Sequence, residues 1–172
     1  LTQKKFDDIQ HLSFFQARSI MGIFYLGLLP SFLYQILELP QGTTWFVALL
    51  FIVFGGDVGA YLVGVQIGKH KIMPAISPKK SWEGSIGGLI FSMAAGFGAS
   101  YFLPTVPLSG LIALGLVGGI VAQFGDFFES LLKRIADVKD SGKLMPGHGG
   151  VLDRVDGILF ASMVFPDPGG PI

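Results

Sequence analysis

The 172-residue sequence predicts an all-α, polytopic transmembrane helix bundle, with about five spans in a single membrane-embedded domain. Composition is the first reason: 51% of the residues are hydrophobic, 14% are charged, and the mean hydropathy is +0.61. Soluble domains carry about 25% charged residues, so this chain lacks the polar surface that contact with water requires. The 25 glycines fit the same class, because glycine is more frequent in transmembrane helices than in soluble ones.

Four apolar stretches are long enough to cross a bilayer core, which takes about 20 residues. They are predicted at residues 15–37, 45–67, 84–103 and 108–128. A fifth, at residues 151–165, would cover only about 22 Å of a roughly 30 Å core at 1.5 Å per residue. Glycines four residues apart within these stretches favour close helix contacts, although a glycine-rich chain also produces this spacing by chance.

The twelve Lys and Arg residues are confined to three regions: the start of the chain, the loop after the second span and the region after the fourth span. The connections at residues 38–44 and 104–107 contain none of them. Because such a bias sets orientation, we expect the N-terminal side and both basic loops to face the cytoplasm. No cleavable signal peptide is evident, and the Pro-rich tail at residues 166–172 predicts a truncated or non-native end.

Carboxylates within the apolar segments mark the candidate site. A carboxylate in a membrane span is costly and normally faces a polar interior. Asp57 lies in the middle of the second span, and Asp126 lies near the end of the fourth. Asp153 and Asp156 share one helix face by their spacing, at the start of the fifth apolar stretch. Carboxylates on facing helices suit a hard cation such as Mg²⁺, which takes oxygen ligands and keeps phosphates in its shell.

A basic, glycine-rich stretch at residues 129–156 connects these helices and is predicted to be a catalytic loop. Glu129 and Lys133 follow Asp126 on the same helix face, and Arg134 comes next. Further along are Lys139, the run Pro146-Gly147-His148-Gly149-Gly150, and Arg154 between two carboxylates. Cationic side chains beside a glycine-rich turn suit the binding of a polyphosphate.

Each of these features has a plainer explanation when it is taken alone. Asp126 then pairs with Lys133 at a helix end, Asp57 is a structural buried carboxylate, and His148 caps a turn. Lys133 and Arg134 then form a positive-inside anchor. Their concentration within residues 126–156 favours a site, because an anchor needs no pair of carboxylates beside it.

The loop after the second span, at residues 77–84, reads Ser-Pro-Lys-Lys-Ser-Trp-Glu-Gly. Its proline fixes the backbone before Lys79 and Lys80. Glu83 stands at a predicted helix start, where the helix dipole favours an anion. Two lysines on a constrained turn can hold a triphosphate; the alternative is an interfacial anchor with Trp82 among the lipid headgroups.

Together these motifs resemble the signature of the phosphatidate cytidylyltransferases, also called CDP-diacylglycerol synthases. The matching motifs are Ser130-x-x-Lys133-Arg134, Lys139-Asp140-x-Gly142, Pro146-Gly147-His148-Gly149-Gly150 and Asp153-Arg154-x-Asp156, with weaker matches at Ser77-Pro78-Lys79-Lys80-Ser81-x-Glu83-Gly84 and Gly56-Asp57-x-x-Ala60-Tyr61. The resemblance covers residues 56–156 and implies a C-terminal portion of a longer protein with additional N-terminal spans.

The resemblance implies an enzyme of phospholipid biosynthesis that converts CTP and phosphatidate to CDP-diacylglycerol and pyrophosphate with Mg²⁺. The implied catalytic residues are Lys133, Arg134, Lys139, His148 and Arg154. The implied substrate-binding residues are Ser77, Lys79, Lys80, Glu83, Ser130, Gly147, Gly149 and Gly150. Asp126, Asp153 and Asp156 are the implied metal ligands, and Asp57 has no firm role. The expected setting is a bacterial inner membrane with a cytoplasmic active site; a homodimer is considered, and no nucleic acid is expected.

Three other functions remain open from the residues. A CTP-dependent lipid-alcohol kinase would need the same metal, cations and membrane, but it would release CDP instead of pyrophosphate. An ion-coupled transporter would use Asp57 and Asp126 as intramembrane sites, although it has no evident need for the basic, glycine-rich loop. A non-catalytic membrane scaffold would tolerate the joint loss of Asp126 and Asp153.

Overall fold

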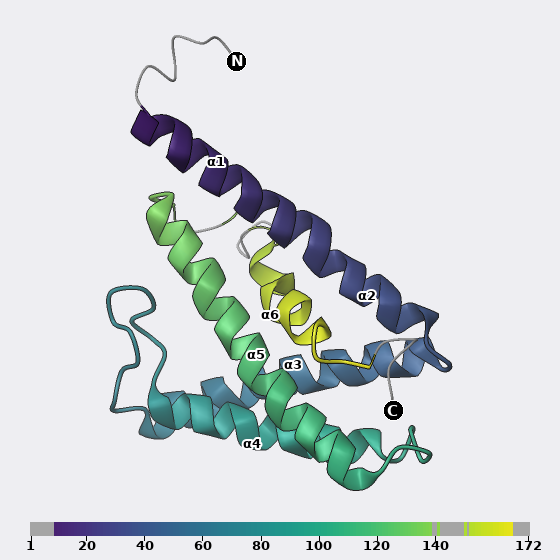
Figure 1. Cartoon of the computed structure of the whole chain (residues 1–172). Coiled ribbons are helices and arrows are strands. Elements are labelled where there is room, and N and C mark those ends of the chain that lie inside the picture. Colours follow the sequence, from purple (N-terminus) through teal and green to yellow (C-terminus); the bar gives the residue numbers. More distant parts are fainter. Residues whose placement is uncertain (1–8, 139–140, 142–149, 151, 167–172) are drawn as a thin grey trace.

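The computed structural model describes residues 9–138, 141, 150 and 152–166. These residues form five continuous helical segments and contain no strand, apart from an isolated antiparallel bridge between Lys71 and Ser81. The first segment runs through α1 (Ile9–Ile23), a π-helical turn η2 (Phe24–Leu28) and α2 (Leu29–Glu38). It is followed by α3 (Gly42–Ile67), α4 (Trp82–Ala99), α5 (Leu108–Ile135) and α6 (Leu152–Ser162). The predicted all-α helix bundle is confirmed (Figure 1).

Three of the described helices are long and apolar enough to cross a membrane: Phe15–Glu38, Gly42–Ile67 and Leu108–Ile135. They correspond to the first, second and fourth predicted spans. The helix at the third predicted span, α4, has 18 residues and is rich in glycine and serine, which lowers its hydropathy. It ends at Ala99, earlier than the predicted residue 103, ahead of Pro104 and Pro107, which disfavour a helix in the residues before them.

The last two predicted boundaries also differ from the structure. Helix α5 continues to Ile135, so residues 129–135 of the predicted catalytic loop are helical. Helix α6 has 11 residues, which at 1.5 Å per residue is about 16 Å. It is therefore a part-span helix and is shorter than the predicted 151–165.

The first helical segment is irregular beside Pro30. The N–H of Leu29 bonds to the carbonyl of Phe24, five residues back, which defines the π turn. Pro30 has no N–H to donate to the preceding turn, and its ring prevents regular α-helical bonding there. The Ser31 hydroxyl donates to the Leu28 carbonyl at 2.6 Å. Within the π turn, Tyr25 is the residue that points into the bundle.

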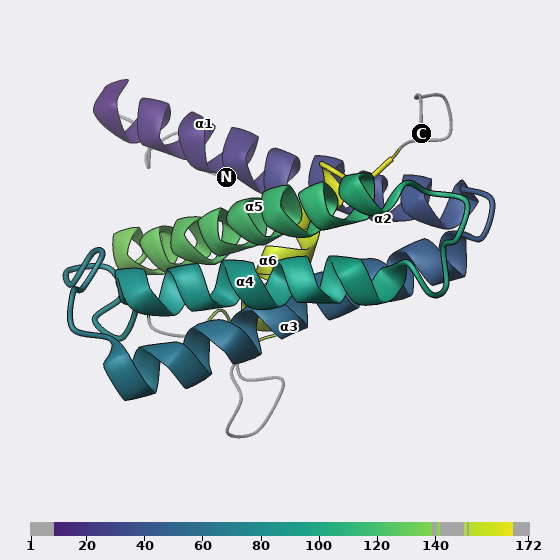
Figure 2. The same ribbon diagram turned by 90° about the horizontal axis from the view of Figure 1, so that it is seen from below.

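Helix α4 lies between α3 and α5, and both contacts are made by small residues (Figure 2). A Cβ atom on Gly88 would lie 2.8 Å from the carbonyl oxygen of Gly56, and one on Gly119 would lie 2.8 Å from the Cβ of Ser92. Ser92 is fully buried, and its hydroxyl donates to the Ile52 carbonyl at 2.9 Å. The glycine spacing therefore does reflect close backbone approach in these helices.

Helix α6 lies inside the bundle, where it contacts α2, α3 and α5 (Figure 1). All residues from Asp156 to Ser162 are buried, and Ile158, Ala161 and Phe165 join the main hydrophobic core with residues of α3. The helix starts with two carboxylates, so burying it brings charged groups into contact with α3 and α5. The candidate site therefore lies where the start of α6 meets α3 and α5.

We expect Gly119→Ala to lower the stability of the bundle by about 1–3 kcal/mol, because the added methyl group has no room against Ser92. Gly98→Ala is the matched control, since nothing lies within 4 Å of the position of its added Cβ. Thermal unfolding of both variants in the same detergent measures the effect. Equal melting temperatures for the two variants would contradict this account of the α4–α5 contact.

Candidate active site

Carboxylates from three helices line one cavity of about 480 Å³. We call it the acidic cavity; its charged lining residues are Asp57 of α3, Asp126 of α5, and Asp153, Arg154 and Asp156 of α6. On its apolar side lie residues of α3, including Phe54 and Val58, which are about half exposed. The structure thus brings together four carboxylates that are up to 99 positions apart in the sequence, Asp57 to Asp156.

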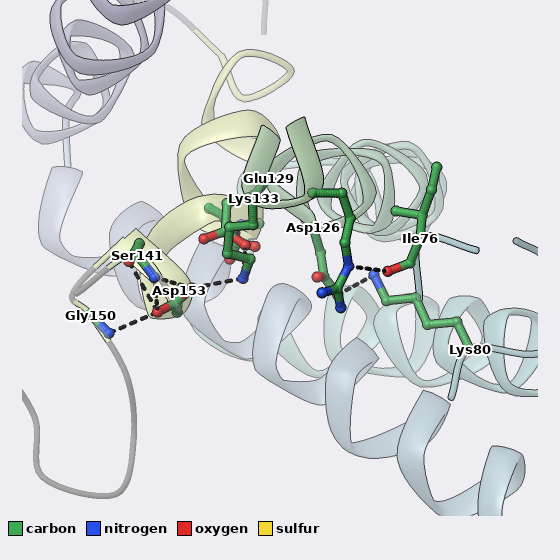
Figure 3. A network of polar contacts seen from close by, with 11 residues as sticks. Ile76, Lys80, Asp126, Glu129, Lys133, Ser141, Gly150 and Asp153 are labelled. Atoms are coloured by element: carbon green, nitrogen blue, oxygen red, sulfur yellow. Dashed lines mark hydrogen bonds and ion pairs between the residues drawn. The ribbon is translucent and has the colours of Figure 1, made fainter. Parts of the chain in front are cut away.

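Lys133 holds two of the carboxylates of this region, from two different helices (Figure 3). Its Nζ forms an ion pair with Glu129, one turn earlier on α5, and a second with Asp153 Oδ1 of α6 at 2.7 Å. Its side chain is 19% exposed, and those of Glu129 and Asp153 are 3% and 11% exposed. Buried charges of this kind require partners, so Lys133 is needed for the two helices to pack here.

Asp153 also fixes the end of the loop before α6. Its Oδ2 accepts hydrogen bonds from the Gly150 N–H at 2.7 Å, and from the N–H and hydroxyl of Ser141, each at 3.0 Å. The hydrogen bond from Gly150, three residues before Asp153, satisfies a backbone N–H ahead of α6. The helix dipole also stabilises an acidic side chain at this end of the helix. In this structure Asp153 therefore has a structural role, whatever else it binds.

A second cavity, of about 270 Å³, shares Asp57 and Asp126 with the acidic cavity. We call it the basic cavity, because Lys79 and Lys80 also line it. Lys80 Nζ lies 2.5 Å from Asp126 Oδ2 and 4.0 Å from the centre of the Phe127 ring. The loop that carries Lys80 therefore contacts α5 at Asp126, as Figure 3 shows.

The loop at residues 68–81 is attached to both α4 and α5. Arg134 Nε donates to the carbonyl of Ile76 at 3.2 Å, and the Ser81 hydroxyl caps α4 by accepting from the Gly84 N–H at 3.2 Å. Glu83 does stand in the first turn of α4, but it binds His70 Nδ1 at 2.5 Å. This hydrogen bond with His70 lowers the pKa of the Glu83 carboxyl to about 2. Glu83 consequently helps to hold the loop in place.

The remaining predicted residues are less informative. Ser130 is partly buried on α5, and Ser77 donates its backbone N–H to the Met73 carbonyl within the loop. Lys139, Gly147, His148 and Gly149 lie outside the described residues, so their predicted roles stay predictions.

A further cavity of about 380 Å³ lies between α3 and α4, between Thr43 and Phe102, but no titratable side chain lines it.

The described residues contain no group of three or more His, Cys, Asp or Glu side chains placed to hold a metal ion. The donor chemistry nevertheless fits Mg²⁺, which is usually bound by one or two carboxylates together with substrate phosphates and water. Asp156 lines the acidic cavity, and its only hydrogen bond among the described residues comes from the adjacent Gly157 N–H at 2.8 Å. The assignment of the three metal ligands stays a prediction.

Two residues of this region were not among the predicted site residues. Glu129 is almost fully buried beside Lys133, and the spacing of four residues between them was the available signal. Tyr25 reaches the same region from the first helical segment, where it packs on Phe160 of α6. No motif marks Tyr25, because its position depends on how helices distant in sequence pack.

We expect Lys133→Met to destabilise the fold by about 3–5 kcal/mol, because it leaves the buried Glu129 carboxylate without its cation. Adding Glu129→Gln should restore part of this loss. Lys69→Met, in an exposed loop position, is the control and should unfold like the wild type. Melting temperatures in detergent distinguish these cases. A Lys133→Met protein that melts with the control would show that the ion pair is not required for packing.

The comparisons with known proteins agree on one family. A model described as "Cytidylyltransferase family" matches residues 6–166. The chain is 40% identical over 136 residues to a phosphatidate cytidylyltransferase of Mycobacterium bovis, covering 78% of this chain and 44% of that protein. It is 39% identical over 145 residues to a phosphatidate cytidylyltransferase of Staphylococcus aureus strain COL, covering 84% of this chain and 55% of that protein. The chain spans about half the length of the curated relatives it matches.

Proposed function

Because the chain belongs to the cytidylyltransferase family, we propose that it forms the catalytic part of an enzyme that makes CDP-diacylglycerol and pyrophosphate from CTP and phosphatidate. A phosphate oxygen of the lipid attacks the α-phosphorus of CTP. The bond from that phosphorus to the oxygen bridging to the β-phosphate breaks, and the electron pair leaves with pyrophosphate. The lipid supplies the nucleophile, so the protein's part is to position the two phosphates and to balance their charge.

The observation that carries this proposal is the convergence of four carboxylates and several cations on two adjoining cavities. Asp126 lies on the wall that the cavities share, with Lys80 on one side and Arg154 on the other. An incoming phosphate competes for the Lys80 ammonium group with Asp126, whose side chain is 40% exposed. Arg154 offers a fork of donors that suits two phosphate oxygens.

Mg²⁺ belongs to the proposal as the cofactor. Asp126, Asp153 and Asp156 are the side chains that would hold it, and bound Mg²⁺ would neutralise charge on the phosphates. Lys79, Lys133 and Arg134 provide further positive charge close by. Lys139 and His148, outside the described residues, are proposed to contact the phosphates as well.

The enzyme is an integral membrane protein, in keeping with its apolar helices and bacterial relatives. We place it in the bacterial inner membrane, with both cavities open to the cytoplasm, where CTP is made. The confinement of all twelve Lys and Arg residues to one side of the predicted spans supports this orientation. A homodimer remains part of the proposal and is tested by the mass of the purified protein in nanodiscs.

Asp156→Asn in the full-length protein should lower the rate of pyrophosphate release from CTP and phosphatidate by about a hundredfold or more. Asp156 is chosen over Asp153 because its direct hydrogen bond among the described residues comes from the adjacent Gly157, whereas Asp153 holds Ser141 of the preceding loop, so loss of activity is less easily confused with loss of packing. Asp137→Asn is the matched control, since Asp137 is exposed and lines neither cavity.

The assay is run in detergent with and without Mg²⁺, and both products of CTP are quantified. Release of CDP without pyrophosphate by the wild type would instead identify a lipid kinase. Wild-type turnover by the Asp156→Asn protein would show that this carboxylate is not required for the reaction.

The orientation is tested with two single-cysteine variants, because the chain contains no cysteine of its own. Lys69 and Thr105 are both exposed and lie in loops at opposite ends of α4. In intact cells, a membrane-impermeant maleimide should label Thr105→Cys and leave Lys69→Cys unlabelled until the membrane is opened. The reverse pattern, or labelling of both, would refute the cytoplasmic placement.

A further inference from the structure

Two buried oxygen atoms have no hydrogen-bond partner within the part of the chain that the structure describes: the hydroxyl of Tyr25 and Oε1 of Glu129. A third such atom among the described residues, Lys80 Nζ, already forms its ion pair with Asp126. A buried polar atom without a partner is costly, so most of them are paired in folded proteins. A hydroxyl can donate and a carboxylate oxygen can accept, so the first two atoms are chemically complementary.

The ring of Tyr25 is held firmly at the site. Tyr25 is 3% exposed, and its ring centroid lies 6.1 Å from that of Phe128 on α5 and 5.8 Å from that of Phe160 on α6. Phe128 is the neighbour of Glu129 in the chain. Phe160 is four residues after Asp156, which places both on one face of α6. The packing therefore sets the ring against the face of α6 that carries Asp156 and beside the turn of α5 that carries Glu129.

The backbone that carries Tyr25 agrees with a role in the site. The residue is supplied by the π turn beside Pro30, and π turns inside α-helices recur at functional sites. The first helical segment thus contributes one polar group to a site otherwise built from α3, α5 and α6.

We infer that Tyr25 is a positioning residue of the site, whose hydroxyl holds a buried water together with the carboxylates of Glu129 and Asp156. A buried water typically needs two to four polar partners, and these three groups provide them. The water completes the hydrogen bonding of Glu129, which orients Lys133 and through it Asp153. Tyr25 itself touches neither substrate. The kinetic test of this inference rests on the proposed function, whereas the test by direct observation of the water does not.

The kinetic test compares Tyr25→Phe with Tyr34→Phe in the full-length protein. Tyr25→Phe keeps the ring packing and removes only the hydroxyl, whereas Tyr34 is 65% exposed on the same helical segment and serves as the matched control. For Tyr25→Phe we expect kcat to fall about tenfold, which is typical when a residue that hydrogen-bonds to a site ligand is removed. The KM for CTP should stay within about twofold of the wild-type value, because Tyr25 does not contact CTP. Its melting temperature should stay near the wild-type value, which a purely structural role would not predict.

A double-mutant cycle tests whether Tyr25 acts through Glu129. The Tyr25→Phe/Glu129→Gln protein should be no slower than Glu129→Gln alone, because both changes break the same connection. Wild-type kcat in Tyr25→Phe, or single effects that multiply in the double variant, would overturn the inference.

A structure that resolves waters gives the readout that does not depend on activity. Density for a water between Tyr25 and Glu129 is expected in the wild type and should be absent in Tyr25→Phe. If the wild type releases no pyrophosphate, the proposed function fails while this density still decides the role of Tyr25. Absence of the water from the wild type would overturn the inference even if the enzyme is active.

Discussion

The ion pairs of Lys133 with Glu129 and Asp153 are the constraint on which the rest of this bundle depends. Helix α6 is buried along most of its length, yet it begins with charged residues. An unpaired carboxylate in such surroundings is very costly, so the helix can pack here only against a cation. Lys133 is that cation, and its place two turns after Asp126 on α5 fixes the register between the two helices.

The second requirement is that α3 come close enough for Asp57 to join the same cavity. Helix α4 makes this possible, because glycine and serine line both of its contacts and let its backbone approach α3 and α5 closely. The residues that hold the helices together thus differ from those that line the cavities. Packing by small side chains leaves the charged groups gathered around the two cavities.

Sequence reasoning predicted most of the fold and the motif residues, because both depend on local patterns. Apolar runs located the long helices and the fifth apolar stretch that contains α6. It ended the fourth span at residue 128, because the charged last turns of α5 lower the hydropathy, although the spacing of Glu129 and Lys133 after Asp126 already placed the three on one helix face. Tyr25 was missed for a different reason: its burial depends on a π turn and on rings from two other helices, which no spacing in the sequence encodes.

The length and charge of α6 also bear on how the protein is made. A membrane span needs about 20 mostly apolar residues, whereas α6 has 11 and carries Asp153, Arg154 and Asp156 in its first half, so we do not expect it to cross the bilayer alone. Helix α5 precedes it in the chain and presents Lys133, so we expect α6 to enter the membrane against α5. Assembly of the site and integration of α6 are then a single event in the biogenesis of this protein.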